Sequence, residues 1–300
     1  MSFLNPVNEP VLRFKSTDAG APQINYNART AGDVKAVLKA CLVTGYGATA
    51  SAGWTAANEI GSVVEFVSPS LSMSDYRFGV DDTSTSSTTW YYQYQDVRVN
   101  PRYNTPAKLF NYANRTDANN GWQLLVTMHG IYFIETVQHV AVNKPSSRLT
   151  FFGQIKEGLT GAEGINIGFY NVGHGAILTE PTTLYQQQQP YFNVKNNQDL
   201  RIFSATPLPL GMVDNVFEKS VIDIVSPLYL ASSNLSIVVG RLPGILSKII
   251  NNVDDLYGVV DTFLDNRPVL KICLGYQDDR AVYANSRARV MLLRLDHWEY

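Results

Sequence analysis

The stretch WQLLVTMHGIYFIETVQHVAV, residues 122–142, decides the fold class of this chain. It holds two apolar runs rich in β-branched and aromatic residues, which favour strands. A turn near His129 and Gly130 separates the two runs. The run LTFFGQI, residues 149–155, follows as a further strand. This part of the chain therefore predicts consecutive strands joined by short connections.

The same pattern of short β-favouring runs extends toward the N-terminus. GSVVEFVSP (61–69) and YRFGVDD (76–82) are short β-favouring runs between turn residues. A polar Ser/Thr loop then leads into an aromatic strand, in which Trp90, Tyr92 and Tyr94 share one face because side chains alternate along a strand. Such a face is typical of a sheet packed in a core or an interface, and the alternative is an exposed ladder that binds sugars or bases.

Further strands are predicted toward the C-terminus, at 201–204, 221–230, 235–239 and in the closing segments PVLKICLGY, AVYANS and RARVMLLRLDHWEY. Many short strands with frequent turns and few helices favour a mainly β fold, an antiparallel β-sandwich or barrel with one or two packed α-helices. The chain shows no βαβ alternation, which argues against a dinucleotide-binding enzyme fold.

One helix is predicted over residues 31–44 and a second, weaker one over Ile245–Leu256. Thr30 is the expected N-cap, with Asp33 as an acidic capping-box partner, and Gly45 is the expected stop. One apolar stripe along the first helix indicates core packing. It consists of Val34, Val37, Leu38, Cys41 and Leu42.

Residues 1–30 are predicted to form an extended N-terminal arm, because prolines and a glycine oppose regular helix there. A short strand is expected at Val11–Phe14. The arm either reaches along a neighbouring subunit or is a frayed terminus. Residues 31–300 are expected to form one β-rich structural domain. The Gln-rich loop near 186–198 is the candidate boundary inside it.

The composition narrows the classes of partner and of cellular site. Hydrophobic residues make up 45% and charged residues 17%, which suits a protein that covers much of its surface with partners. The formal net charge of -2 gives no basic excess, so nucleic-acid binding is not expected. No membrane-spanning run and no signal peptide are expected. Cys41 and Cys273 are interpreted as buried thiols of a protein made in a reducing cytoplasm.

The sequence predicts no catalytic, cofactor-binding or metal-binding residues. Its four histidines occur in no HExxH pattern, and no CxxC, nucleophile elbow or phosphate loop is present. His129 and His139 are close enough in sequence to meet across a hairpin. Adjacent aspartates at 81–82, 254–255 and 278–279 are interpreted as solvated turns, and Asp278-Asp279 is the choice if one pair is functional.

Three groups of segments carry a family pattern. The first is STDAGAPQI (16–24), AGDVKAVLKACLVTGYG (31–47) and AGWT (52–55). The second is NNGWQLLVTMHGIYFIE (119–135) with RLTFFGQI (148–155), and the third is VVGRLPGIL (238–246). In this order they resemble a group of tailed-bacteriophage and prophage virion proteins. The resemblance implies a structural component of the virion, of tail or baseplate type, and no catalytic residues.

Assembly is the expected mechanism, with other virion proteins and further copies of the chain as partners. The candidate interface residues are Trp90, Tyr92 and Tyr94 on the aromatic strand and Trp298 and Tyr300 at the C-terminus, because Trp and Tyr dominate binding hot spots. Ordinary core strands are the alternative for both groups. The alternative functions are a receptor- or glycan-binding module at the tail tip and a capsid-decorating protein, while a cell-wall hydrolase lacks a carboxylate pair at a suitable spacing.

Overall fold

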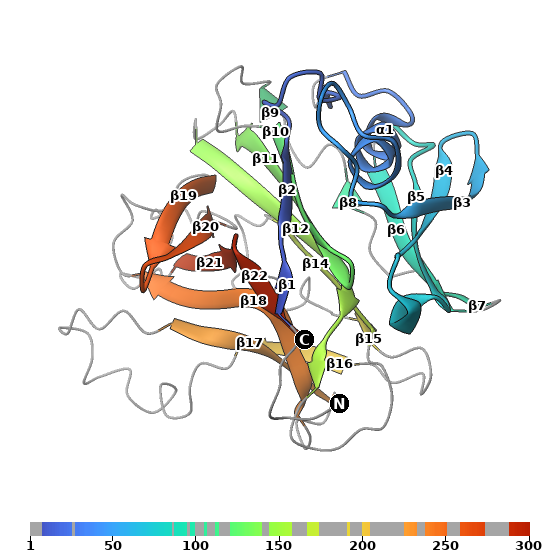
Figure 1. Ribbon diagram of the computed structural model, residues 1–300. Helices are drawn as coiled ribbons and strands as arrows, with labels where there is room; N and C mark the ends of the chain where they lie inside the picture. Colours follow the sequence, from blue (N-terminus) through green and yellow to red (C-terminus); the bar gives the residue numbers. More distant parts are fainter. Residues whose placement is uncertain are drawn as a thin grey trace, which may run out of the picture.

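The computed structural model shows a mainly β protein with large antiparallel sheets, as the sequence predicts, and one α-helix among the described residues (Figure 1). The residues described are 8–25, 28–85, 87–94, 97–99, 105–106, 112–113, 121–139, 144–157, 167–173, 191–192, 200–204, 225–232, 238–250, 259–273 and 288–300. Most of the candidate boundary at 186–198 lies outside them.

The central sheet is built from the stretch that decides the fold. Its strand order is β15-β14-β12-β11-β10-β2, and β9 also pairs with β11. The bounds are β2 Leu12–Lys15, β9 Tyr112–Ala113, β10 Gly121–Thr127, β11 Gly130–His139, β12 Lys144–Gln154, β14 Ile167–Gly173 and β15 Tyr191–Phe192.

Both faces of the central sheet are buried. Side chains alternate between the faces of a strand, and here successive apolar residues enter two different cores. Leu124 and Phe133 belong to the first core, whereas Leu125 and Tyr132 belong to the second. This explains why β10 and β11 read as continuous apolar runs, as strands buried on both sides do.

The first outer sheet has the order β3-β4-β5-β6-β7, with β8 also paired to β6. Val64, Phe66, Phe78 and Trp90 from this sheet fill the first core, and Phe78 stacks on Phe152 of the central sheet with ring centroids 5.1 Å apart. The bounds are β3 Thr55–Ile60, β4 Val63–Val67, β5 Tyr76–Asp81, β6 Ser87–Tyr94, β7 Val97–Val99 and β8 Thr105–Pro106, with a 3₁₀ turn at Leu71–Met73.

The second outer sheet covers the opposite face, with the order β16-β17-β18-β21-β20-β19 and β13 paired to β18. The three large sheets therefore form layers with the central sheet in the middle (Figure 1). The bounds are β13 Lys156–Glu157, β16 Leu200–Ser204, β17 Val225–Ser232, β18 Val238–Ile250, β19 Val259–Leu264, β20 Arg267–Cys273 and β21 Ala288–Arg294.

The second predicted helix, at Ile245–Leu256, is wrong for its first six residues. These residues are the end of β18, where Ile245 pairs with Leu293 and Ile250 with Ala288 of β21. Isoleucine is β-branched and fits a paired strand better than a helix. Residues 251–256 lie outside the described part of the chain.

The first helix is confirmed, but its last turn is π-helical and its N-cap is not the expected residue. Helix α1 spans Asp33–Lys39 and continues as a π-helical turn, Ala40–Thr44, that ends at Gly45 with a φ of 76°. Its predicted stripe is buried in the first core. The carboxylate of Asp33 accepts the backbone N–H of Thr30 at 2.9 Å, which is half of the predicted capping box. The N-cap residue is Gly32, which has no side chain to accept a backbone N–H, so the expectation of Thr30 as the N-cap is wrong.

The described part of the N-terminal segment is extended but pairs within its own chain. β1, Asn8–Pro10, pairs with the C-terminal strand β22, His297–Glu299. β2, drawn in dark blue, pairs with β10 at the edge of the central sheet (Figure 1). Strands β1 and β2 are therefore part of the fold of their own chain, with β22 and β10 as their backbone partners, and the contact of the arm with a neighbouring subunit stays a prediction.

Segments of the first and second family-like groups meet at one junction. The Tyr46 hydroxyl donates to Asp18 at 2.8 Å, and the Trp122 indole N–H donates to the Pro22 carbonyl at 2.8 Å. Gly20 and Gly47 approach closely, so that a Cβ on Gly47 would lie 2.5 Å from the Ala19 carbonyl oxygen. These residues fasten the segment after β2 to the end of the helical turn.

Gly244 of the VVGRLPGIL segment lies directly under Trp298. A Cβ on Gly244 would stand 2.0 Å from Cδ1 of the Trp298 ring, and the residue has a φ of +67°. Tyr132 of the central sheet packs edge-on against Trp298 with ring centroids 4.9 Å apart and donates its hydroxyl to the Pro243 carbonyl at 2.8 Å. The lack of a side chain at Gly244 therefore lets the Trp298 ring pack directly against the second outer sheet.

We expect Gly244→Ala to lower the free energy of unfolding by roughly 3 kcal/mol, because the new methyl displaces Trp298 and a left-handed φ is also unfavourable for alanine. Gly61→Ala is the matched control. Gly61 has a φ of +56° but nothing within 4 Å of its Cβ position, so only the backbone cost of about 1–2 kcal/mol applies. Urea unfolding of both variants measures the difference, and equal losses would contradict the packing explanation.

Candidate functional site

The predicted interface residues whose side chains are described lie inside the protein. Trp90 and Trp298 are fully buried and Tyr300 is 8% exposed. Trp90 stacks on Phe78 with ring centroids 5.6 Å apart. Trp90 and Trp298 have no exposed surface in the single chain and Tyr300 has little, which favours the core alternative for these three residues. The backbone of Tyr92 and Tyr94 lies in β6, while their side chains are outside the described part.

The described residues hold no group of three or more His, Cys, Asp or Glu side chains arranged to bind a metal ion. No helix within the same ranges has the length and apolar character needed to cross a membrane. Cys41 is a buried free thiol, as predicted, and its burial raises the pKa of the thiol far above the ordinary value. A thiol held protonated in this way is a poor nucleophile.

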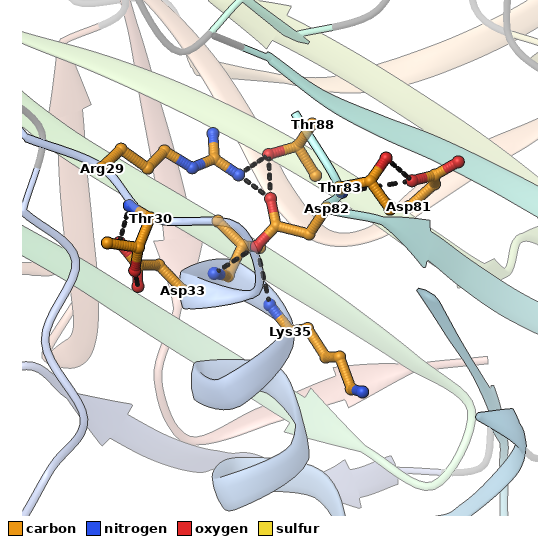
Figure 2. Close-up of polar contacts among 9 residues, drawn as sticks. Arg29, Thr30, Asp33, Lys35, Asp81, Asp82, Thr83 and Thr88 are labelled. Atoms are coloured by element: carbon orange, nitrogen blue, oxygen red, sulfur yellow. Dashed lines mark hydrogen bonds and ion pairs between the residues drawn. The ribbon is translucent and has the colours of Figure 1, made fainter. Parts of the chain in front are cut away.

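The most developed polar cluster centres on Asp82, which is fully buried (Figure 2). One of its carboxylate oxygens accepts the backbone N–H groups of Val34 at 2.8 Å and Lys35 at 3.3 Å. The other oxygen accepts the Thr88 hydroxyl at 3.1 Å and pairs with the buried guanidinium of Arg29. Asp82 therefore caps helix α1 from another part of the chain and is itself neutralised by Arg29.

The backbone of Asp82 completes the same junction. Its carbonyl accepts the N–H of Gly32 at 2.9 Å, and its N–H donates to the Ser62 carbonyl at 3.1 Å. The start of α1, the loop before β4 and the start of β6 thus converge on one residue. Because both carboxylate oxygens are engaged with protein groups, the junction is suited to fixing the helix against the sheet and not to proton transfer.

Asp81 and Asp82 have opposite environments, so the interpretation of this pair as a solvated turn is wrong for Asp82. Neighbouring side chains at a strand end point to opposite faces. Asp81 bonds only locally, accepting the Thr83 hydroxyl at 2.7 Å, while Asp82 turns inward (Figure 2). The buried face of β5, Tyr76-Phe78-Val80, predicts that position 82 points inward, and this alternation was the signal available in the sequence. Asp278-Asp279 lies outside the described residues.

A second polar cluster lies on the outer face of the first outer sheet. Glu65 is 5% exposed and accepts bonds from Asn58 at 2.7 Å, Arg77 at 3.3 Å and the Tyr91 hydroxyl at 3.3 Å. The Tyr91 ring lies over Gly79, where a Cβ would stand 2.1 Å away. The side chains of this cluster cover the outer face of the sheet, and the Glu65 carboxylate is hydrogen-bonded by residues of its own chain.

A third cluster lies at the turn between β10 and β11, next to both described ends of the chain. The His129 ring packs against Tyr300 with centroids 4.9 Å apart, and its Nδ1 lies 3.7 Å from a carboxylate oxygen of Glu9. The Tyr300 hydroxyl and Thr127 Oγ1 are 2.7 Å apart. Burial lowers the pKa of His129, and the nearby Glu9 partly opposes this effect.

His129 and His139 do not meet across the hairpin. His129 is in the turn that precedes β11, whereas His139 is the last residue of β11. A strand advances roughly 3.3 Å per residue, so the two residues are placed at opposite ends of it.

Among the described residues, apolar side chains are exposed on three edge strands: Leu12 on β2, Ile60 on β3, and Val260 and Phe263 on β19. Phe263 is 73% exposed and Val260 is 42% exposed. β19 pairs with β20 on one side and is the last strand of its sheet. Arg13 of β2 holds Asp261 in a two-point ion pair, with distances of 2.8 and 2.6 Å, so the edges of the central and second outer sheets are joined here. Such an edge presents backbone and apolar groups that another strand can pair with.

We expect Asp82→Asn to lower the free energy of unfolding by about 3–5 kcal/mol, because the buried Arg29 guanidinium loses its counter-ion. Asp81→Asn is the matched control and should change the free energy by less than about 1 kcal/mol, since its bonds are local and exposed. Denaturant unfolding of the two variants measures both values. Similar effects at the two positions would contradict the capping role of Asp82.

We expect the free energy of unfolding to decrease as the pH falls below about 6.5, the ordinary pKa of histidine. The folded protein holds His129 neutral, with a lowered pKa, so the unfolded chain binds the proton first and gains stability from it. His129→Gln should flatten this dependence between pH 7 and pH 5 relative to the wild-type chain. A slope unchanged in His129→Gln would show that other groups cause it.

Comparison of the chain with protein-family models, with curated proteins and with solved structures found no match.

Proposed function

We propose that this chain is a non-enzymatic structural component of a tailed-phage virion, of tail or baseplate type, which acts through contacts with other protein chains. Other virion proteins and further copies of the chain are its partners. The protein is made in the bacterial cytoplasm and works in the particle.

The observation that carries the proposal is the contrast between the buried polar groups and the β19 edge. Asp82 and Glu65 are bound by side chains and backbone of their own chain, which leaves these carboxylates occupied by structural contacts. Phe263 and Val260, by contrast, place apolar area in water along an edge strand. Exposed apolar area of this kind is stabilised by covering it with another protein.

The assignment to a virion is supported by the family-like segments and by their arrangement. Segments 16–24 and 31–47 bind each other through Asp18 and Tyr46, and Trp122 of the second group bonds to Pro22 of the first. Residues separated in sequence thus serve one joint, which gives a physical reason for their occurrence together. The resemblance alone favours tail or baseplate over a capsid-decorating position.

The test is localisation of the protein in purified particles produced by the phage or prophage that carries its gene. We expect immunogold labelling and cryo-electron microscopy to place it in the tail or baseplate, in several copies. Labelling of the head would instead support a capsid-decorating protein, and absence from particles would contradict the proposal. Binding of the purified protein to a glycan array would support the receptor-binding alternative, and substrate turnover by it would contradict a non-enzymatic role.

A further inference from the structure

We propose that two copies of this chain associate edge to edge through β19, in antiparallel orientation, with Thr262 on the two-fold axis. The inference deepens the proposed function by naming one assembly contact and its partner, a second copy of the chain. It joins two seven-stranded outer sheets into one continuous sheet.

The backbone groups of successive residues in β19 point alternately to β20 and to the open side. Leu264 and Arg267 close a two-residue turn in which Asp265 and Asn266 have φ values of 50° and 63°, as in a type I′ hairpin. Such a closing pair is hydrogen-bonded, and bonded pairs alternate along an antiparallel ladder. Thr262 and Val260 therefore bond to β20, and the N–H and C=O groups of Asp261 and Phe263 point to the open side.

Among the described residues, nothing protects the open edge of β19 from pairing with another strand. Edge strands usually carry a bulge, a proline, a free charge or a very short length, which prevent pairing with other chains. β3 has a bulge between Ala57 and Ile60, and β2 is only four residues long. β19 has six residues, VVDTFL, in unbroken register with β20 and without proline or lysine.

The one charge in β19 does not protect the edge either. Asp261 is held by Arg13 of its own chain, and this guanidinium lowers the pKa of the carboxyl. The ion pair is thus neutral as a unit at neutral pH. A second strand can approach it without meeting an unpaired charge.

The register between the two β19 strands follows from this geometry. When a two-fold axis normal to the sheet relates the two copies, residues whose backbone groups point to the open side pair with one another. The axis then passes between the two copies of Asp261 or between the two copies of Thr262. Centring on Asp261 places two carboxylates opposite each other, which is unfavourable. Centring on Thr262 places a threonine pair on the axis and sets Val260 of each copy opposite Leu264 of the other, on the same face.

The same register accounts for the exposure of Phe263. It places Phe263 opposite Asp261 of the second copy and therefore beside the Arg13 guanidinium that holds this aspartate. An arginine over or beside an aromatic ring is attractive when water is excluded. The side chain that is 73% exposed in the single chain is covered in the pair.

Cysteine cross-linking tests the register directly. Two residues on the axis form a non-hydrogen-bonded pair with Cα atoms about 4.5 Å apart, a spacing that a disulfide spans. We expect Thr262→Cys to form a covalent dimer under mild oxidation. Val260→Cys is the matched control and should stay monomeric on a non-reducing gel, because the two copies of residue 260 are roughly 14 Å apart in this register. The wild-type chain controls for the native cysteines.

A charge pair tests the same contact without oxidation. Val260→Lys and Leu264→Glu should each weaken dimerisation severalfold in sedimentation-equilibrium measurements over a concentration series, because each sets a charge against an apolar residue. The double variant should regain it, since the two new charges face each other twice across the axis. Circular dichroism melting curves of the variants check that the fold is retained.

The outcomes separate this inference from the proposed function. Absence of a Thr262→Cys dimer, or equal cross-linking of Val260→Cys, overturns the β19 pairing. The presence of the protein in particles is measured independently and stands or falls alone. A dimer that forms as expected, from a protein absent from particles, supports the pairing and contradicts the virion role.

Discussion

Burial of the central sheet on both of its faces is the constraint on which the rest of the structure depends. Leu125 and Tyr132 face one core while Leu124 and Phe133 face the other, so neither outer sheet can be removed without exposing half of the central strands to water. The hydrophobic effect therefore couples the two halves of the protein through one layer. It also explains a chain with many hydrophobic and few charged residues, because two cores are filled from 300 residues.

Polar contacts serve this layered packing at the places where elements distant in sequence meet. Asp82 fixes the start of α1 against the first outer sheet, and Arg13 with Asp261 joins the edges of the other two sheets. Tyr300 and Thr127 connect the last described residue to the β10–β11 turn. Each contact is directional, whereas the apolar cores are not, so these contacts select one arrangement among the many that would bury similar area.

The sequence predicts those features that depend on neighbours along the chain. The apolar runs and β-branched residues of 122–142 predict β10 and β11, and Gly45 ends the helical turn as expected. Features set by distant residues were missed: the cap of α1 comes from Asp82, and the strand at Ile245–Ile250 is decided by its pairing with β21. Burial of Trp90 was also undecided, because an aromatic face looks the same in a core and in an interface.

The pairing of β1 with β22 has a consequence for the order in which the protein is made. Glu9 is synthesised long before its partner Trp298, which lies 289 residues further along the chain. During translation the backbone groups of β1 therefore stay bonded to water until β22 has been synthesised. Long-range pairing of this kind is slow to form, so β1 remains open to pairing with other strands until late in synthesis.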